Sequence, residues 1–249
     1  MNRASLRVVL YVSAALLVVA MLKLGFWQLS RADEKQGIQD FVSTQNKKEI
    51  DVGVEAISVD NLYQRAFGVG GYIVEHSILI DNQVHEGRVG YHVLTPFRFE
   101  KNNQIILVNS GWVPVGASRE IKPIISLPEG RINISGRLQR PHSQPPIWRD
   151  NHLLVQDRAW QYLALDEFEK RTQLTVASLI LELDPSLVGV GGYERKWRVY
   201  DDTWINRHKA YALQWFSLAV AFILMCLMLE FRSRKSLKQL ASTRNSKDA

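Results

Sequence analysis

A histidine and several aromatic residues stand at one end of an apolar segment, where they could bind a cofactor. His208 precedes Tyr211 by three positions and Trp215 by seven, so a helix would carry the three side chains on one face. Neutral imidazole is a common axial ligand of haem iron, and flat aromatic side chains can line a porphyrin. Trp27 stands at the end of a second apolar segment and could add a wall to this site if the two segments pair.

Two interpretations of these residues follow from the pattern. In the first, His208 is the axial ligand of a haem iron, and Trp27, Tyr211 and Trp215 form the walls of the pocket. In the second, His208 is a polar residue at a membrane surface, and the aromatic residues form the belt that is usual at that depth. The residue types alone leave both interpretations open.

Two apolar segments must position these side chains. They cover residues 6–29 and 210–231, and about 20 apolar residues in a helix cross a hydrocarbon core of about 30 Å. Because backbone polar groups find no water in lipid, such segments cross it as helices. Basic residues lie at or beyond the terminal ends of both segments, at Arg3, Arg7, Arg232, Arg234, Lys235 and Lys238. The positive-inside pattern then predicts that both termini are cytoplasmic.

This topology divides the chain into four parts. We predict a cytoplasmic tail with the first transmembrane helix at 1–29, a β-rich periplasmic domain at 30–209, the second transmembrane helix at 210–231, and a basic cytoplasmic tail at 232–249. The N-terminus leaves no room for a mitochondrial presequence ahead of the first segment, which favours a bacterial inner membrane.

The charge distribution argues against nucleic acid as a partner. The formal net charge of the chain is +6, but positions 30–209 contain 22 Lys and Arg against 23 Asp and Glu. The surplus therefore lies in the tails and at Lys23, beside the apolar segments, as is typical of membrane topology.

The single cysteine, Cys226, lies in the second apolar segment. An intramolecular disulfide and a thiol pair for metal transfer are thus excluded.

The middle of the chain predicts a mostly antiparallel sheet or partial barrel with one or two helices. Segments rich in β-branched residues or with alternating polarity predict strands at 67–75, 77–84, 91–99, 104–113, 131–138 and 176–183. A helical pattern covers 159–173, and the polar segment 33–48 is expected to continue the first helix. The expected fold class is a membrane α+β protein whose two transmembrane helices flank this domain.

No group of residues in the sequence predicts catalysis. The histidines lack the HxxxH and HExxH spacings of zinc sites on a helix, and neither a GxSxG motif nor a phosphate-binding loop is present. His85 and His92 flank the turn-like sequence EGRVG, and we interpret both as solvated loop residues. The sequence GVGG at 68–71 lies within a strand pattern and predicts a bulge. We expect that the protein is not an enzyme.

Glycines, prolines and one tryptophan of the middle segment predict a turn, the limits of two strands and a core position. Gly87 and Gly90 bracket a turn that leads into the next strand. Pro96 is expected to interrupt that strand at an edge, and Pro114 to end the following one, because proline cannot donate to a ladder. Trp112 is expected in the core.

Four motifs spread over residues 24–216 carry a resemblance to a known family. They are LGFWQL at 24–29 with Arg31 and Lys35, GRVGYHVLTP at 87–96, VNSGWVP at 108–114 with GRL at 136–138 and Pro141, and His208 with YALQWF at 211–216. In these motifs the chain resembles the surfeit locus protein 1 family of cytochrome c oxidase assembly factors. It departs at Glu34, where the family often has an aromatic residue, and at Ser110, where the family often has arginine.

The resemblance implies an assembly factor that acts on the catalytic subunit of a haem-copper oxidase. It also implies transient binding of haem a, with the iron on His208, the histidine of the last motif. The other expected partners are the lipid bilayer and a haem a synthase. The alternative is a scaffold that holds oxidase subunits and binds no haem. A membrane-anchored enzyme acting on haem or a quinone is a third class, and the absence of a general base beside a nucleophile argues against it.

Overall fold

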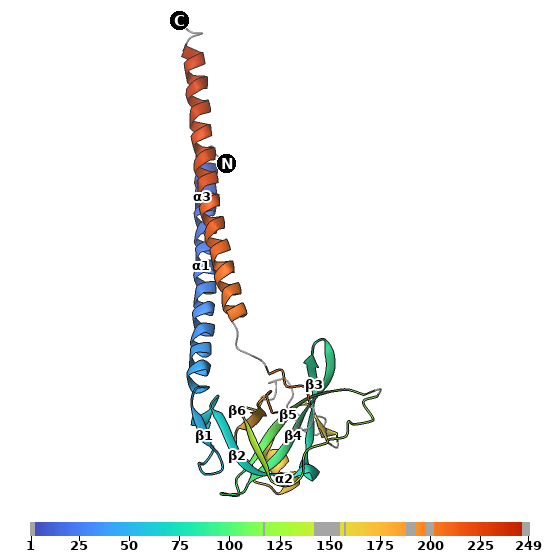
Figure 1. Cartoon of the computed structure of the whole chain (residues 1–249). Helices are drawn as coiled ribbons and strands as arrows, with labels where there is room; N and C mark the ends of the chain where they lie inside the picture. The colour runs from blue at the N-terminus through green and yellow to red at the C-terminus, as the bar shows by residue number, and fades with distance from the viewer. Residues whose placement is uncertain are drawn as a thin grey trace. The chain divides into compact units, whose positions relative to one another are not determined.

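The computed structural model describes residues 3–116, 118–141, 155–156, 158–187, 193–197 and 202–245 (Figure 1). Contacts between residues divide the chain into two units. The helix unit consists of Met1–Asp40 and Tyr200–Ala249, and the β unit consists of Phe41–Val199.

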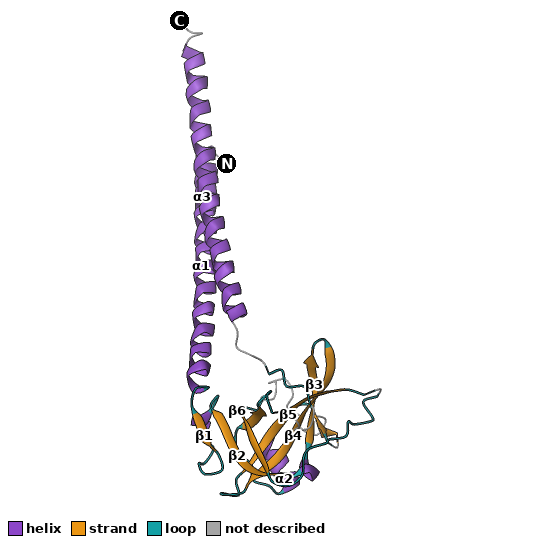
Figure 2. Cartoon of the chain, viewed as in Figure 1, coloured by secondary structure: helices purple, strands orange, loops and turns teal. Residues whose placement is uncertain are grey.

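Two long α-helices make up the helix unit (Figure 2). Helix α1 spans Arg3–Gln45 and helix α3 spans Asp202–Asn245. Each helix contains a segment long and apolar enough to cross a membrane, with a mean hydropathy of 2.3 in α1 and 2.2 in α3. The structure thus confirms the two predicted apolar helices and the continuation of the first helix beyond its apolar segment.

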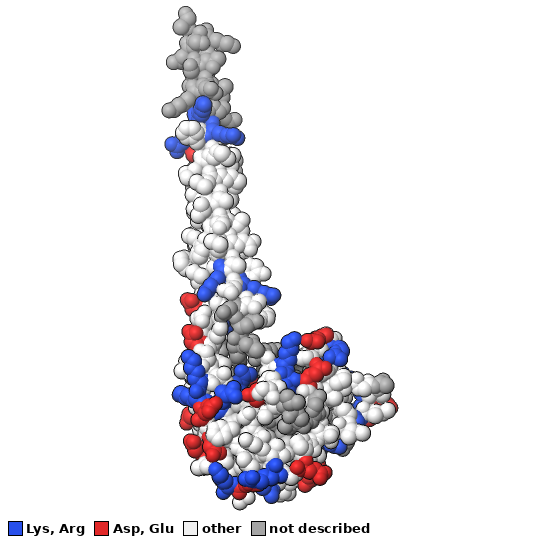
Figure 3. Space-filling view, viewed as in Figure 1, with Lys and Arg blue, Asp and Glu red and all other residues white. Residues whose placement is uncertain are grey.

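The surface of the helix unit suits lipid better than water. Large apolar side chains along both helices are exposed, for example Leu16 at 65% and Leu227 at 62%. Figure 3 shows uncharged residues along the middle of the helix pair and Lys and Arg side chains toward both of its ends. An exposed apolar surface of this size indicates membrane association.

The strands of the β unit are β1 (Glu49–Asp51), β2 (Arg65–Tyr72), β3 (Ile78–His85), β4 (Arg88–Phe99), β5 (Ile105–Pro114), β6 (Ile132–Gln139), β7 (Val155–Gln156), β8 (Ala159–Trp160) and β9 (Ile180–Leu183). Among the described residues they form one sheet in the order β1-β2-β6-β9-β5-β4-β3-β8-β7, and β2 also pairs with β4. This additional pairing closes β2, β6, β9, β5 and β4 into a barrel, so these strands share no open edge. The pairs are antiparallel except β1–β2, β3–β8 and β5–β9.

The barrel is filled by apolar side chains that alternate inward along its strands. Phe97 and Phe99 of β4 and Ile106 and Val108 of β5 are fully buried in one cluster. Trp112 is also buried, and its indole N–H donates to the carbonyl oxygen of Gln83 at 2.9 Å. The expected core position of this tryptophan is thus confirmed, as is the end of β5 at a proline.

Pro96 does not interrupt β4, contrary to the expectation from sequence. It lies where β4 changes its partner, because β4 pairs with β3 as far as Leu94 and with β2 from Phe97. The carbonyl oxygen of Pro96 accepts from the backbone N–H of Ile73 at 2.9 Å. The N–H that proline lacks falls in the gap between the two partner strands, so no ladder bond is lost.

The glycine-rich segment of β2 lies very close to the backbone of β4 and does not form the expected bulge. The register of β2 with β6 runs without a shift through Gly68 and Gly70. A Cβ on Gly70 would lie 2.0 Å from the carbonyl oxygen of Arg98, where β2 meets β4. Glycine is therefore required at this point for the barrel to close.

The helix of the β unit is shorter than predicted. Helix α2 spans Leu165–Thr172, and Ala159–Trp160 forms strand β8 instead of the first helical turn. Trp160 packs in a buried cluster with Phe168 of α2, so tertiary contacts override the helical pattern at this position. The helix ends at Gln173, which has a left-handed backbone with φ of 57°.

Candidate functional site at the helix pair

Small residues bring α1 and α3 close together. Ala32 of α1 and Ala212 and Ala219 of α3 are buried, although most of their neighbours are exposed. Gly25 of α1 lies under the ring of Phe216, and a Cβ at this position would be 2.5 Å from a ring carbon. Such small residues allow close helix packing in a membrane, where apolar burial alone gives no driving force.

His208 and Gln28 form a hydrogen bond across this helix pair. The imidazole Nδ1 of His208 lies 2.7 Å from Oε1 of Gln28, and both side chains are partly buried. An amide oxygen only accepts, so Nδ1 carries the proton in this bond. In the neutral imidazole, Nε2 then keeps its lone pair. This is the arrangement by which an outer partner fixes the tautomer and ring orientation of a metal-ligating histidine.

The three aromatic residues of the predicted site differ in how far they are exposed. Trp215 is half-buried, whereas Trp27 and Tyr211 are 51% and 53% exposed. Trp27 directly precedes Gln28, and one residue turns a helix by about 100°, so Trp27 faces away from the contact with α3. The guanidinium of Arg31 lies 5.9 Å from the centre of the Trp27 ring. The role of these aromatic residues as pocket walls stays a prediction.

Gln28 is the residue of this site that sequence reasoning did not assign a role. It belongs to the motif at 24–29, and it is a polar residue near the end of an apolar segment, where an unpaired amide would be costly. This position in the sequence was the signal by which Gln28 could have been assigned to the site. Its partner is 180 positions away, and residue types alone do not define such a contact.

His85 and His92 lie in strands and are not the solvated loop residues that were expected. The side chain of His85 is 13% exposed, and its Nε2 lies 2.9 Å from a carboxylate oxygen of Glu194. The loop prediction failed because the turn is shorter than the glycine spacing suggested. It consists only of Glu86 and Gly87, with φ of 48° and 77°. Two residues with positive φ form a tight hairpin turn, so the strands extend to both histidines.

A cluster of charged residues lines a pocket of about 380 Å³ in the β unit. Arg137 pairs with Glu182 at 3.0 Å, and both side chains are largely buried. Arg65 pairs with Asp184 at 2.8 Å. The backbone N–H of Ser186 donates to Asp184 and, together with the Arg65 pair, lowers the pKa of this carboxyl. These pairs hold β2, β6 and the end of β9 together, and we assign them a structural role.

A metal ion held by protein ligands alone would need a cluster of ligating side chains. Among the residues that the structure describes, no group of three or more His, Cys, Asp or Glu side chains has this arrangement.

Comparison with known proteins identifies the family to which this chain is similar. The SURF1 family model matches residues 15–220, a range that includes Gln28 and His208. A SURF1-like protein of Monosiga brevicollis is 22% identical over 218 residues, which are 83% of this chain and 82% of the relative. A SURF1-like protein of Rickettsia prowazekii is 23% identical over 240 residues, or 92% and 96% of the two chains. Surfeit locus protein 1 of Gallus gallus is 24% identical over 220 residues, or 80% and 68%.

Proposed function

This chain belongs to the SURF1 family, and we propose that it is an assembly factor for cytochrome c oxidase, a haem-copper terminal oxidase. The family is one of assembly factors and not of catalysts. Two helices with exposed apolar surfaces support a place in the membrane where such an oxidase is built. We propose the bacterial inner membrane, with both termini in the cytoplasm and residues 30–209 in the periplasm.

We further propose that the protein holds haem a transiently as cargo, with His208 as the axial ligand of its iron. The observation that carries this proposal is the hydrogen bond of 2.7 Å between Nδ1 of His208 and Oε1 of Gln28. It leaves Nε2 as the nitrogen that can donate a lone pair to iron. A single protein ligand suits a carrier, because the cargo must later be released.

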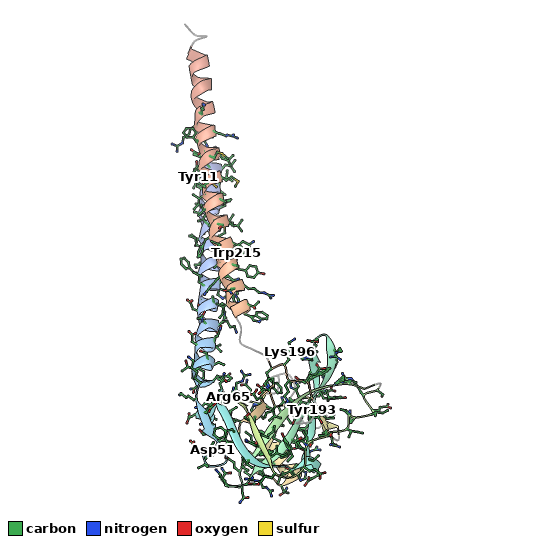
Figure 4. The ribbon with its side chains drawn as sticks, in the orientation of Figure 1. Tyr11, Asp51, Arg65, Tyr193, Lys196 and Trp215 are labelled. Carbon is green, nitrogen blue, oxygen red and sulfur yellow. The ribbon has the colours of Figure 1, made fainter. Side chains whose placement is uncertain are left out.

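Trp27, Tyr211 and Trp215 would offer apolar surface to a flat macrocycle bound at His208. Trp27 and Tyr211 each expose about half of their surface, which a porphyrin or lipid chains could cover. Trp215 lies two helical turns beyond His208 on α3 and is labelled on that helix in Figure 4. In this proposal the haem comes from a haem a synthase and passes to the catalytic subunit of the oxidase.

The absorption spectrum of the reduced protein tests this function. The full chain is purified in detergent from cells that make haem a, beside His208→Ala and a matched control, Lys209→Ala. Lys209 is the next residue on α3 and is exposed. We expect a haem a band in the parent and in Lys209→Ala, and loss of the band in His208→Ala. Circular dichroism establishes that all three proteins have the same helix content.

Two other outcomes would change the assignment. A chain that carries no haem a band in any form would act as a scaffold for oxidase subunits, without haem. A band that survives in His208→Ala would support haem a as the cargo but exclude His208 as the ligand of its iron. In that case the bond to Gln28 would serve only to pair the two helices.

A further inference from the structure

The helix pair contains a cavity near the start of α1. We call this end of the helix pair the Tyr11 end, and the end where His208 bonds to Gln28 the His208 end. The cavity lies between α1 and α3 and has a volume of about 570 Å³. Its walls are mainly apolar and include Leu10 and Leu17 of α1 and Phe222 of α3. Because these walls have few polar groups, water would gain few hydrogen bonds there.

Polar groups gather at one end of this cavity. The hydroxyl of Tyr11 donates to Oε2 of Glu230 at 2.7 Å, and Nε of Arg234 donates to Oε1 of the same carboxylate at 2.7 Å. Arg7 lines the cavity at this end as well. Two guanidinium groups beside one carboxylate leave a net positive charge.

The depth of the cavity matches one leaflet of a bilayer. On α1 its lining residues run from Arg7 to Leu17, and ten residues of helix rise about 15 Å. The hydrocarbon core of a bilayer is about 30 Å thick, so one leaflet is about 15 Å. The charged end of the cavity therefore falls at the level of lipid headgroups, and the apolar part falls at the level of acyl chains.

We propose that this cavity binds an anionic phospholipid, with one acyl chain between α1 and α3 and its phosphate beside Arg7 and Arg234. The net positive end complements the phosphate, and the apolar walls complement the chain. The lipid completes the packing of the two helices where their own side chains leave a gap.

Native mass spectrometry of the full chain tests this site. The protein is reconstituted into nanodiscs with equal amounts of phosphatidylglycerol and phosphatidylcholine, then released, and the lipids that stay bound are counted. We expect one retained phosphatidylglycerol. Arg7→Gln should reduce its preference over phosphatidylcholine about fivefold, the effect of one basic side chain at an anionic surface. The matched control Arg232→Gln removes an exposed arginine outside the cavity lining and should change the preference less than twofold.

Two further variants fill the cavity from opposite helices. Ala14→Phe on α1 and Cys226→Phe on α3 each place a ring among the lining residues, and each should abolish retention of both lipids while helix content stays unchanged. Equal retention of the two lipids by the parent, or full retention in both filled variants, would overturn the proposal. The test does not involve haem, so its result is independent of the proposed cargo.

Discussion

The two ends of the helix pair join α1 to α3 by similar means and leave different spaces around the bond. At the His208 end, a histidine bonds to a glutamine at 2.7 Å, and Gly25 and Ala212 bring the helices into close contact. At the Tyr11 end, a tyrosine bonds to a carboxylate at 2.7 Å, but a cavity remains between the helices. Close packing fixes the orientation of one ligand side chain, whereas loose packing leaves room for a lipid.

The largest effect is expected from a bulky residue at the close contact. Gly25→Leu places side-chain atoms where the ring of Phe216 lies, and overpacking of this kind costs about 1–3 kcal/mol. We expect a lower midpoint of thermal unfolding in detergent, followed by circular dichroism, and loss of the haem a band.

A second substitution, at the residue that Gly25 contacts, serves as the control for Gly25→Leu. Phe216→Ala in the same chain removes the ring and should restore part of the band. If Gly25→Leu alone keeps both the band and the midpoint, the close contact is not required. Retention of phosphatidylglycerol at the Tyr11 end should be affected less than the haem band, because the cavity begins beyond this contact.

A smaller effect is expected from removal of the acceptor of the histidine bond. Gln28→Leu keeps the side-chain size but leaves Nδ1 of His208 without its oxygen, and loss of such an outer partner lowers affinity roughly 10- to 100-fold. Haem titration of the purified protein measures this change. Gln214→Leu, at an exposed glutamine of α3, is the control and should bind haem as the parent does. Equal affinities of all three proteins would contradict a role for Gln28.

A weaker effect is expected at the Tyr11 end. Tyr11→Phe removes the hydroxyl that donates to Glu230 but keeps the ring and the bond from Arg234. Since Tyr11 is exposed and Glu230 only partly buried, we expect a smaller decrease of the unfolding midpoint than for Gly25→Leu, and an unchanged haem a band. A band lost in this variant would mean that the two ends do not act separately.

The smallest effect concerns the β unit and varies with pH. The lowered pKa of Asp184 arises from the N–H of Ser186 and then from Arg65, so this carboxylate stabilises the fold above the ordinary pKa of Asp, about 3.9. The contribution disappears as the pH falls through the lowered value of the folded state. Urea unfolding should show the parent more stable than Asp184→Asn at pH 6, with the difference starting to decrease below about pH 4 and decreasing further as the pH falls through the lowered pKa of Asp184. A constant difference would exclude titration of Asp184 as the cause.

The sequence predicted the elements better than their partners. Length and hydropathy identified both apolar helices, and alternation of polarity placed the main strands, because these signals are local. The closure of the barrel depends on the pairing of Leu107 with Ile180 and of Gly70 with Phe99, which join distant parts of the chain. The change of partner at Pro96 has the same origin, and so does the strand at Trp160, where tertiary packing overrides a helical pattern.

The helix that carries the candidate site residues could be predicted from the sequence, whereas the side chains that they meet could not, and their role as a haem site stays a prediction. Helical spacing grouped His208 with Tyr211 and Trp215, and these residues do lie on one helix. The rotation of α1 relative to α3 decides which side chains meet, and small residues such as Gly25 set that rotation. For this reason Gln28, and not its neighbour Trp27, faces His208.

The central claim is that His208 supplies the axial ligand to the haem iron, and imidazole rescue tests it most directly. His208→Gly removes the side chain and leaves space for free imidazole beside Gln28. We predict that the purified variant lacks the haem a band, and that adding haem a together with imidazole restores a band that adding haem a alone does not. A band of parental intensity in the variant without imidazole would contradict the claim.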